Sequence, residues 1–224
     1  MLFPDMSRTA AVIVDLQKEN YSEGQCPVAG YKKVLANAAN VISACRQAGI
    51  MPIYTQHLLD SMGRDGRAYE PRDHSGTPRG SVAGTSGSEI CDEVAPSEDD
   101  IIVTKQRFSA FYNTRLESIL RRFDIRNLII FGVWTEHCLE TTVYDASMRD
   151  YRIALVADSC GGSTEISHKA AILNMANWLF GGTILSSDQI VRALGGQEFR
   201  AWRYPGSNQF PYTLETLETM YGSL

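Results

Sequence analysis

The sequence predicts an α/β fold in which a mostly parallel sheet of about six strands carries helices on both faces. Three observations lead to this prediction. Short apolar runs alternate with segments of helical periodicity along the chain, which is typical of a parallel sheet. Several helical segments are bounded by capping residues or by glycine. At 224 residues, the chain can bury the core of one large domain, which we expect over residues 1–194.

The predicted strands are short runs of mainly aliphatic and β-branched residues, which favour buried, extended segments. In chain order they span residues 10–15, 50–55, 101–104, 127–132, 152–157 and 183–185. Each run ends near a polar, glycine or small residue, so we expect the strands to stop there.

The predicted helices lie between these strands, with apolar residues at helical spacing. The first spans 31–48 and ends before Gly49, a usual helix terminator. The second is expected to start at Thr114, because Thr114 and Glu117 have the spacing of a capping box. The remaining helices are expected over about 138–149, 165–180 and 186–194, the last capped by Ser186.

Two segments do not fit the alternation. Residues 58–95 are rich in Gly, Ser, Arg and Asp and are too long for a plain connection, so we expect a functional loop or lid. Residues 195–224 form a tail that we expect to pack on its own domain or on a neighbouring subunit. That tail contains Trp202, Tyr204, Phe210, Pro211, Tyr212 and Tyr221.

The composition excludes several classes of partner. A net charge of −5 argues against electrostatic binding to nucleic acid or to an anionic membrane. No apolar run approaches the roughly 20 residues of a membrane span, and the N-terminus lacks a secretory pattern, so we expect a cytoplasmic protein. The five cysteines are an odd count without a C-x-x-C pair, which favours neither a disulfide framework nor a cysteine-rich zinc site.

Chemically active side chains stand at the predicted C-terminal ends of the strands. They are Asp15, His57, Lys105, Cys138 and Asp158. Open parallel sheets bind ligands beyond these ends. The sequence therefore predicts that the side chains gather around one pocket.

Three of these residues suit nucleophilic catalysis. Cys138 follows a strand and a short turn at the expected start of a helix, where unpaired amides and the helix dipole favour a thiolate. A thiol nucleophile needs a proton acceptor, a role open to Asp15, and Lys105 could hold the negative charge. The alternative is structural: Asp15 would cap its turn, and Lys105 would reach solvent.

The other candidates favour no metal and no cofactor. His57 has acidic residues nearby, but its spacing matches no strong metal motif. His137 and His168 are expected to be structural, as is Asp158. Gly161 and Gly162 lack the rest of a phosphate-binding fingerprint.

Three segments of the chain resemble the isochorismatase-like cysteine hydrolases. They are Val14-Asp-Leu-Gln17, Lys105-Gln-Arg-Phe-Ser-Ala-Phe-Tyr-Asn-Thr114 and Gly132-Val-Trp-Thr-Glu-His-Cys138. This family includes nicotinamidases, N-carbamoylsarcosine amidases, biuret hydrolases and ureidoacrylate amidohydrolases. The resemblance covers roughly residues 8–194. Within the family, the segments beginning at Gly84 and Asn113 look most similar to the ureido- and carbamoyl-cleaving members.

The resemblance implies a Rossmann-like, three-layer α/β/α sandwich with an Asp15–Lys105–Cys138 triad. It also implies a cis peptide between Val133 and Trp134, and an oxyanion hole made by the backbone amides of Trp134 and Cys138. The metal-binding members carry an Asp-x-His pair where this chain has His57-Leu-Leu59, so no metal is expected. The family is also expected to form homo-oligomers, here a dimer or tetramer.

From this resemblance we expect a cysteine-dependent amidohydrolase that cleaves a small linear amide of carbamoyl or ureido type through a thioester. The expected pocket walls are Tyr21, His57, Phe108, Phe111 and Trp134. One of the loop arginines, Arg64, Arg67 or Arg72, could hold a substrate carboxylate. The alternatives are a nicotinamidase-like or isochorismatase-type hydrolase, or a catalytically silent binding or scaffold protein.

Overall fold

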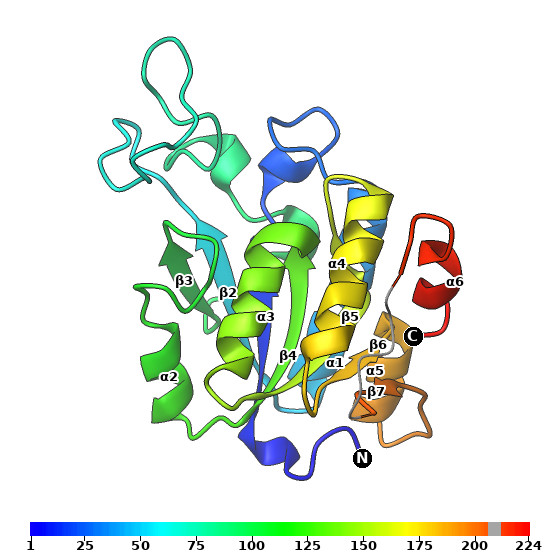
Figure 1. Ribbon diagram of the computed structural model, residues 1–224. Helices are drawn as coiled ribbons and strands as arrows, with labels where there is room; N and C mark the ends of the chain where they lie inside the picture. The colour runs from blue at the N-terminus through cyan, green and yellow to red at the C-terminus, as the bar shows by residue number, and fades with distance from the viewer. Residues whose placement is uncertain (206–211) are drawn as a thin grey trace.

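The computed structural model describes residues 1–205 and 212–224, and it shows a single seven-stranded sheet at the centre of the molecule (Figure 1). The strand order is β3-β2-β1-β4-β5-β6-β7. All neighbouring strands run parallel except β7, which pairs antiparallel with β6. The strands are β1 (Thr9–Val14), β2 (Met51–His57), β3 (Ile101–Lys105), β4 (Asn127–Val133), β5 (Arg152–Gly161), β6 (Thr183–Leu185) and β7 (Trp202–Arg203).

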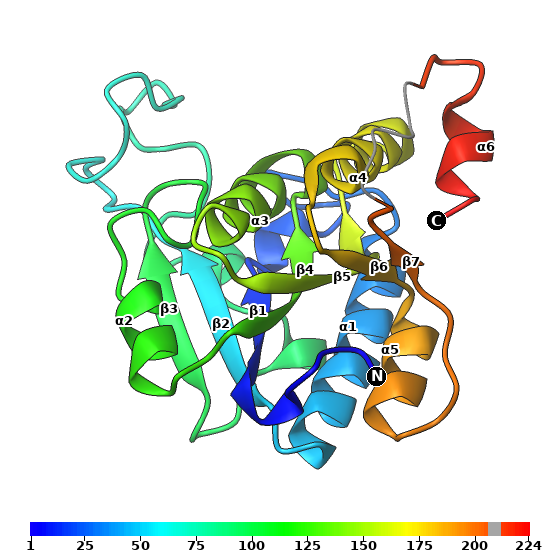
Figure 2. The same cartoon turned by 60° about the horizontal axis from the view of Figure 1, so that its bottom comes forward.

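Helices cover both faces of the sheet, which confirms the predicted three-layer α/β architecture. The helices are α1 (Tyr31–Gln47), α2 (Leu116–Arg122), α3 (Glu140–Ser147), α4 (Glu165–Trp178), α5 (Ser187–Leu194) and α6 (Leu217–Tyr221). Figure 2 shows α1 and α5 on one face and α3 and α4 on the other. Every residue of β1 and β4 is buried, as expected for central strands covered on both sides.

The element boundaries differ from the predicted ones in two informative places, and one predicted cap is confirmed. The fifth strand runs on to Gly161, because it resumes pairing with β4 after a bulge between Ile130 and Gly132. Helix α2 begins at Leu116, with Arg115 as its N-cap residue. The predicted capping box at Thr114 is therefore wrong: the Thr114 hydroxyl accepts a hydrogen bond from the amide of Leu116, the first residue of the helix. Ser186 does cap α5, accepting from the Gln189 amide.

The long segment 58–95 contains no strand and only short 3₁₀ turns. Isolated bridges fasten it: Leu59 pairs with Val82, and Ile90 pairs with Gln17 just beyond β1. The segment therefore starts and ends beside the C-terminal ends of the strands and rises above them (Figure 1).

The C-terminal tail contacts its own chain. Trp202 lies on β7, Tyr204 packs 5.0 Å from Phe180 between ring centroids, and Leu217 of α6 is buried. Phe210 and Pro211 lie outside the described residues. Among the helices of the described ranges, none is long and apolar enough to cross a membrane.

Candidate active site

Asp15 follows β1 directly, and its side chain is held by the neighbouring strand β2. Its backbone adopts a positive φ of 49°, a left-handed conformation that aspartate tolerates better than most residues. The Thr55 hydroxyl donates to Oδ1 at 2.7 Å, and the Asn20 amide group donates to the Asp15 carbonyl at 3.1 Å. The carboxylate is therefore fixed and almost completely buried, at 5% exposed.

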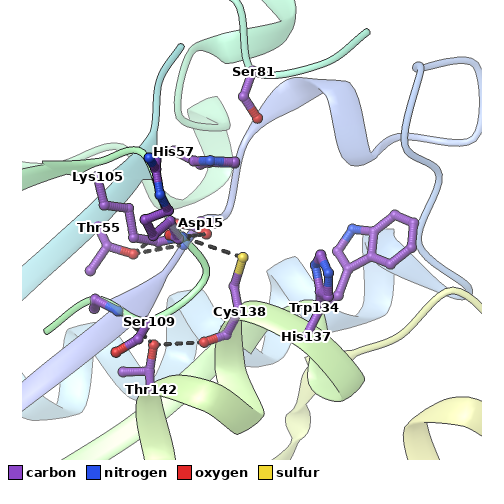
Figure 3. Close-up of polar contacts among 12 residues, drawn as sticks. Asp15, Thr55, His57, Ser81, Lys105, Ser109, Trp134, His137, Cys138 and Thr142 are labelled. Atoms are coloured by element: carbon purple, nitrogen blue, oxygen red, sulfur yellow. Dashed lines mark hydrogen bonds and ion pairs between the residues drawn. The ribbon is translucent and has the colours of Figure 1, made fainter. Parts of the chain in front are cut away.

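Lys105 ends β3 and is fully buried between the other two candidate residues. Its Nζ lies 2.6 Å from Asp15 Oδ2 and 3.3 Å from Cys138 Sγ, and it also donates to the Arg107 carbonyl at 3.0 Å (Figure 3). Burial by itself would lower the pKa of the Lys105 ammonium, but the Asp15 carboxylate and the Cys138 sulfur raise it above its ordinary value. The charged form of Lys105 is therefore favoured, and the structural alternative in which it reaches solvent is wrong, because its side chain is fully buried.

Cys138 lies in a π-helical turn, Thr135–Leu139, that precedes α3. Its carbonyl accepts a hydrogen bond from the Thr142 hydroxyl at 2.6 Å. Burial raises the pKa of the Cys138 thiol to about 12, and the adjacent Lys105 ammonium offsets only part of this rise. The expectation of a stabilised thiolate is thus corrected: desolvation outweighs the favourable end of the helix, and the resting thiol keeps its proton.

The turn before Cys138 contains the cis peptide that the resemblance implies. The peptide bond between Val133 and Trp134 is cis. Within the described ranges, the Trp134 backbone N–H donates to no protein acceptor. The Trp134 indole donates to the Asn20 side chain at 2.9 Å, which fixes the ring at the cavity wall.

A cavity of about 600 Å³ opens above the three residues. The strand ends form its floor, and the segment 58–95 contributes its outer wall. Its lining includes Asp15, Gln17, Glu19, Asn20, His57, Arg67, Glu70, Arg79, Ser81, Phe108, Trp134, His137 and Cys138.

Three of the five expected wall residues line this cavity, namely His57, Phe108 and Trp134. The other two do not, and the expectation is corrected for them. The Tyr21 hydroxyl donates to Glu93 at 2.7 Å, and its ring packs edge-on against Tyr31. Phe111 is buried elsewhere, with its ring 5.9 Å from that of Tyr151 and under the Arg149 guanidinium.

The histidines of the site are neutral. Burial, with a smaller effect from the Lys105 charge, lowers the pKa of His57 to about 4, and its buried Nε2 has no hydrogen-bond partner in the described structure. His137 lies at the rim, with its ring 3.5 Å from Phe108 between centroids. Asp158 lies outside the cavity and accepts two hydrogen bonds from Ser187. In the described ranges, no three His, Cys, Asp or Glu side chains are grouped to hold a metal ion.

The sequence alone could not indicate which of the three loop arginines holds a substrate carboxylate, but the structure places them differently. Arg67 lines the cavity, stacks 3.9 Å from the Phe108 ring centroid and makes two hydrogen bonds of 2.8 Å to Glu70. Arg64 pairs with Asp60 and does not line the cavity. Arg72 donates to three backbone carbonyls within its own loop.

Gln17 and Glu19 line the cavity, although the sequence alone suggested no role for either side chain. The buried Gln17 side chain donates to the carbonyls of His57 and Ser88 and accepts from the His57 amide, so it clamps β2 to the loop. Glu19 accepts from both the amide and the hydroxyl of Ser81, each at 2.6 Å. Gln17 falls in the first resembling segment, which was a usable signal, whereas Glu19 gave none because its partner is distant in sequence.

Comparison with known proteins places these features in context. Residues 9–189 match the family model described as the isochorismatase domain. A probable inactive nicotinamidase of Arabidopsis thaliana is 35% identical over 173 residues, which covers 75% of this chain and 88% of that protein. Ureidoacrylate amidohydrolase RutB of Acinetobacter baylyi is 31% identical over 189 residues, which covers 75% of this chain and 77% of that protein.

Solved structures agree with the fold. A cysteine hydrolase from Pseudomonas syringae pv. phaseolicola superposes with a TM-score of 0.78 at 25% identity, covering 86% of this chain and 94% of that one. N-carbamoylsarcosine amidase from Thermoplasma acidophilum superposes with a TM-score of 0.68 at 28% identity, covering 81% of this chain and 97% of that one.

Proposed function

This chain belongs to the isochorismatase family, and on that premise we propose that it is a cysteine-dependent amidohydrolase of a small linear amide. The observation that carries the proposal is the contact of Lys105 Nζ with both Asp15 Oδ2, at 2.6 Å, and Cys138 Sγ, at 3.3 Å. Burying an acid, an ammonium and a thiol together is costly unless they interact. Asp15 and Cys138 line an open cavity and Lys105 contacts both of them from below, which supports a catalytic use.

The proposed reaction begins with proton transfer from the Cys138 thiol to the Asp15 carboxylate as Sγ attacks the substrate carbonyl. The carbonyl oxygen becomes negative, and the backbone amides of Trp134 and Cys138 donate to it. The C–N bond then breaks, Asp15 returns the proton to the departing nitrogen, and ammonia or an amine leaves a thioester behind. Asp15 next takes a proton from water, whose oxygen attacks the thioester carbonyl, and the departing sulfur recovers that proton.

The raised pKa of Cys138 fits this order of events. A thiol that keeps its proton at rest needs a base beside it at the moment of attack, and Asp15 is that base. Lys105 stays charged throughout, so it stabilises the carboxylate and the developing thiolate in turn. His57 and His137 are neutral, and neither contacts Sγ in the hydrogen bonds of the described residues.

The cavity favours a substrate that carries a carboxylate at the end remote from the reacting carbonyl. Arginine has five N–H donors, and Glu70 takes only two of those on Arg67. The remaining donors belong to a planar group held over Phe108 at the cavity wall, which suits a carboxylate. Ureido and carbamoyl acids combine the two groups, and the names of the Acinetobacter and Thermoplasma relatives agree with this class.

The similarity to the Arabidopsis protein favours a second candidate, a nicotinamidase-like protein or one that keeps the fold without turnover. A silent protein has no need to retain a buried acid, ammonium and thiol in contact, so the geometry supports the active alternative.

The test is hydrolysis of a panel of N-carbamoyl amino acids, ureido acids, simple ureas, nicotinamide and isochorismate, followed by ammonia release for the amides and by loss of substrate for isochorismate, whose ether cleavage releases no ammonia. We expect turnover of at least one carbamoyl or ureido acid, and a loss in kcat/KM of about 10⁴-fold or more in Cys138→Ala. Cys160→Ala is the matched control, because Cys160 is equally buried but donates to the Val156 carbonyl and lacks an acid–lysine pair. Turnover of none of the linear amides, or wild-type rates in Cys138→Ala, would overturn the proposal.

A further inference from the structure

The turn that carries Cys138 is tied to the C-terminal helix by a chain of two hydrogen bonds. Thr135, the first residue of the turn, is fully buried, and its hydroxyl lies 2.8 Å from His168 Nδ1 on α4. The other ring nitrogen, Nε2, lies 3.0 Å from the Tyr221 hydroxyl on α6. The chain thus runs from α6 through α4 to the residue next to Trp134.

Helix α6 also contacts α4 through an ion pair and a ring contact, in addition to the hydrogen bond between Tyr221 and His168. Lys169 Nζ pairs with Glu218 of α6 at 2.5 Å and with Glu165 of α4 at 2.7 Å. The Tyr221 and His168 rings meet edge to face, with centroids 5.7 Å apart. Figures 1 and 2 show α6 beside α4, on the side away from α3. The Tyr221 hydroxyl is therefore presented to His168 by a docked helix.

Both ring nitrogens of His168 are occupied, so the two hydrogen bonds depend on each other. Burial lowers the pKa of His168 to about 4, and a neutral imidazole has one donor and one acceptor nitrogen. If Nε2 accepts a hydrogen bond from the Tyr221 hydroxyl, Nδ1 carries the proton and donates to the Thr135 hydroxyl. If Nε2 instead donates to Tyr221, Nδ1 accepts from Thr135. Removing the Tyr221 hydroxyl would leave one buried nitrogen unpaired and would free the tautomer and the ring plane.

We propose that Tyr221 is a positioning residue for the nucleophile turn, acting through His168 and Thr135. By fixing His168, it holds Thr135 and, through the adjoining peptide, the Trp134 amide that the proposed reaction uses as an oxyanion donor. The inference rests on the proposed function. It assigns a role to a residue beyond 9–189, the segment that matches the family domain.

The same turn has a second anchor that makes the specific role of Tyr221 testable. The Glu136 side chain accepts from the amide and the hydroxyl of Ser163, at 2.7 and 2.5 Å. We therefore expect the turn to stay folded when Tyr221 is changed. Loss of the hydroxyl is expected to alter its fine orientation only.

The experiment is a double-mutant cycle with Tyr221→Phe and Thr135→Val, each of which keeps the side-chain shape. We expect Tyr221→Phe to lower kcat about three- to tenfold with little change in KM, the effect of one buried hydrogen bond. In the Thr135→Val background it should have no further effect, because the hydrogen-bond chain is already cut. Glu218→Gln is the control: it weakens the pairing of α6 with Lys169 but leaves Tyr221, His168 and Thr135 unchanged, and it should leave kcat near the wild-type value.

Additive effects of the two substitutions, or an equal fall in kcat for Glu218→Gln, would show that α6 contributes only general packing and would overturn the inference. A second measurement does not require turnover: the rate at which iodoacetamide alkylates Cys138, followed by peptide mass spectrometry. We expect Tyr221→Phe to change this rate at least threefold, because the turn that Tyr221 positions also carries Cys138. An unchanged alkylation rate overturns the inference, whereas an absence of turnover in the wild type overturns only the proposed function.

Discussion

The charged residues of the cavity floor and those of the segment that forms its outer wall differ in burial and in how far apart their partners lie in the sequence. On the floor, Asp15, Lys105 and Cys138 come from the ends of three strands, and Lys105 is 0% exposed. In the segment 58–95, which contributes the wall, Asp60 pairs with Arg64 away from the cavity and Arg67 pairs with Glu70 at the cavity itself; the partners are three or four residues apart and partly open to water. The floor depends on the whole sheet, whereas the wall depends on local turns.

Buried and exposed charges differ in their energetic weight, and this separates the part of the molecule that determines the reaction from the part that determines the substrate. A buried charge that loses its partner costs several kcal/mol, and an exposed pair contributes about 0–1 kcal/mol. Changes in the floor should therefore affect both stability and chemistry. Changes in the wall should alter substrate binding and little else.

The largest expected effect is that of Lys105→Met, which keeps the length of the side chain but removes its charge. Asp15 would then be buried without a cation, so we expect the free energy of unfolding to fall by about 3–5 kcal/mol, and activity to be lost. Urea unfolding followed by circular dichroism measures the first effect. Arg64→Met, in the segment 58–95, should change the free energy of unfolding by no more than about 1 kcal/mol. Equal losses in the two variants would contradict the difference between buried and exposed ion pairs.

The protonation state of Cys138 provides the next test. Only the thiolate reacts with iodoacetamide, and the pKa of Cys138 is raised to about 12. Below that pKa the thiolate fraction rises with pH, so the alkylation rate should increase by about tenfold per pH unit between pH 7 and 9. A plateau below pH 8 would mean that the floor stabilises the thiolate after all, in conflict with its desolvation.

The smallest expected effect concerns the wall. Arg67→Ala should raise KM for a carboxylate-bearing amide by about tenfold while leaving kcat almost unchanged, because a charge-assisted hydrogen bond contributes about 1.5–3 kcal/mol. Arg64→Ala is the control: it removes an arginine from the same loop that does not line the cavity. Similar KM values for the two variants, measured by ammonia release, would remove Arg67 from substrate recognition.

The difference between floor and wall also explains which site residues could be predicted from the sequence. Strand ends in a parallel sheet converge, so Asp15, Lys105 and Cys138 could be placed together from their positions after apolar runs. The wall residues could not, because the side-chain directions of Tyr21 and Phe111 depend on neighbours that are distant in sequence, such as Glu93 and Tyr151. The raised pKa of Cys138 was missed for a related reason: its cause is the depth of burial, which the local turn does not reveal.

The seventh strand was missed because two residues, Trp202 and Arg203, carry no periodicity. Its shortness has a consequence for association. A sheet edge with many unpaired backbone groups recruits other chains, and proteins blunt such edges with short strands, proline and charged side chains. Here β7 is followed closely by Pro205, and at the opposite edge the Arg115 guanidinium donates to the Ile102 carbonyl of β3. Both borders of the sheet therefore resist edge-to-edge pairing, which protects the protein against aggregation by strand addition.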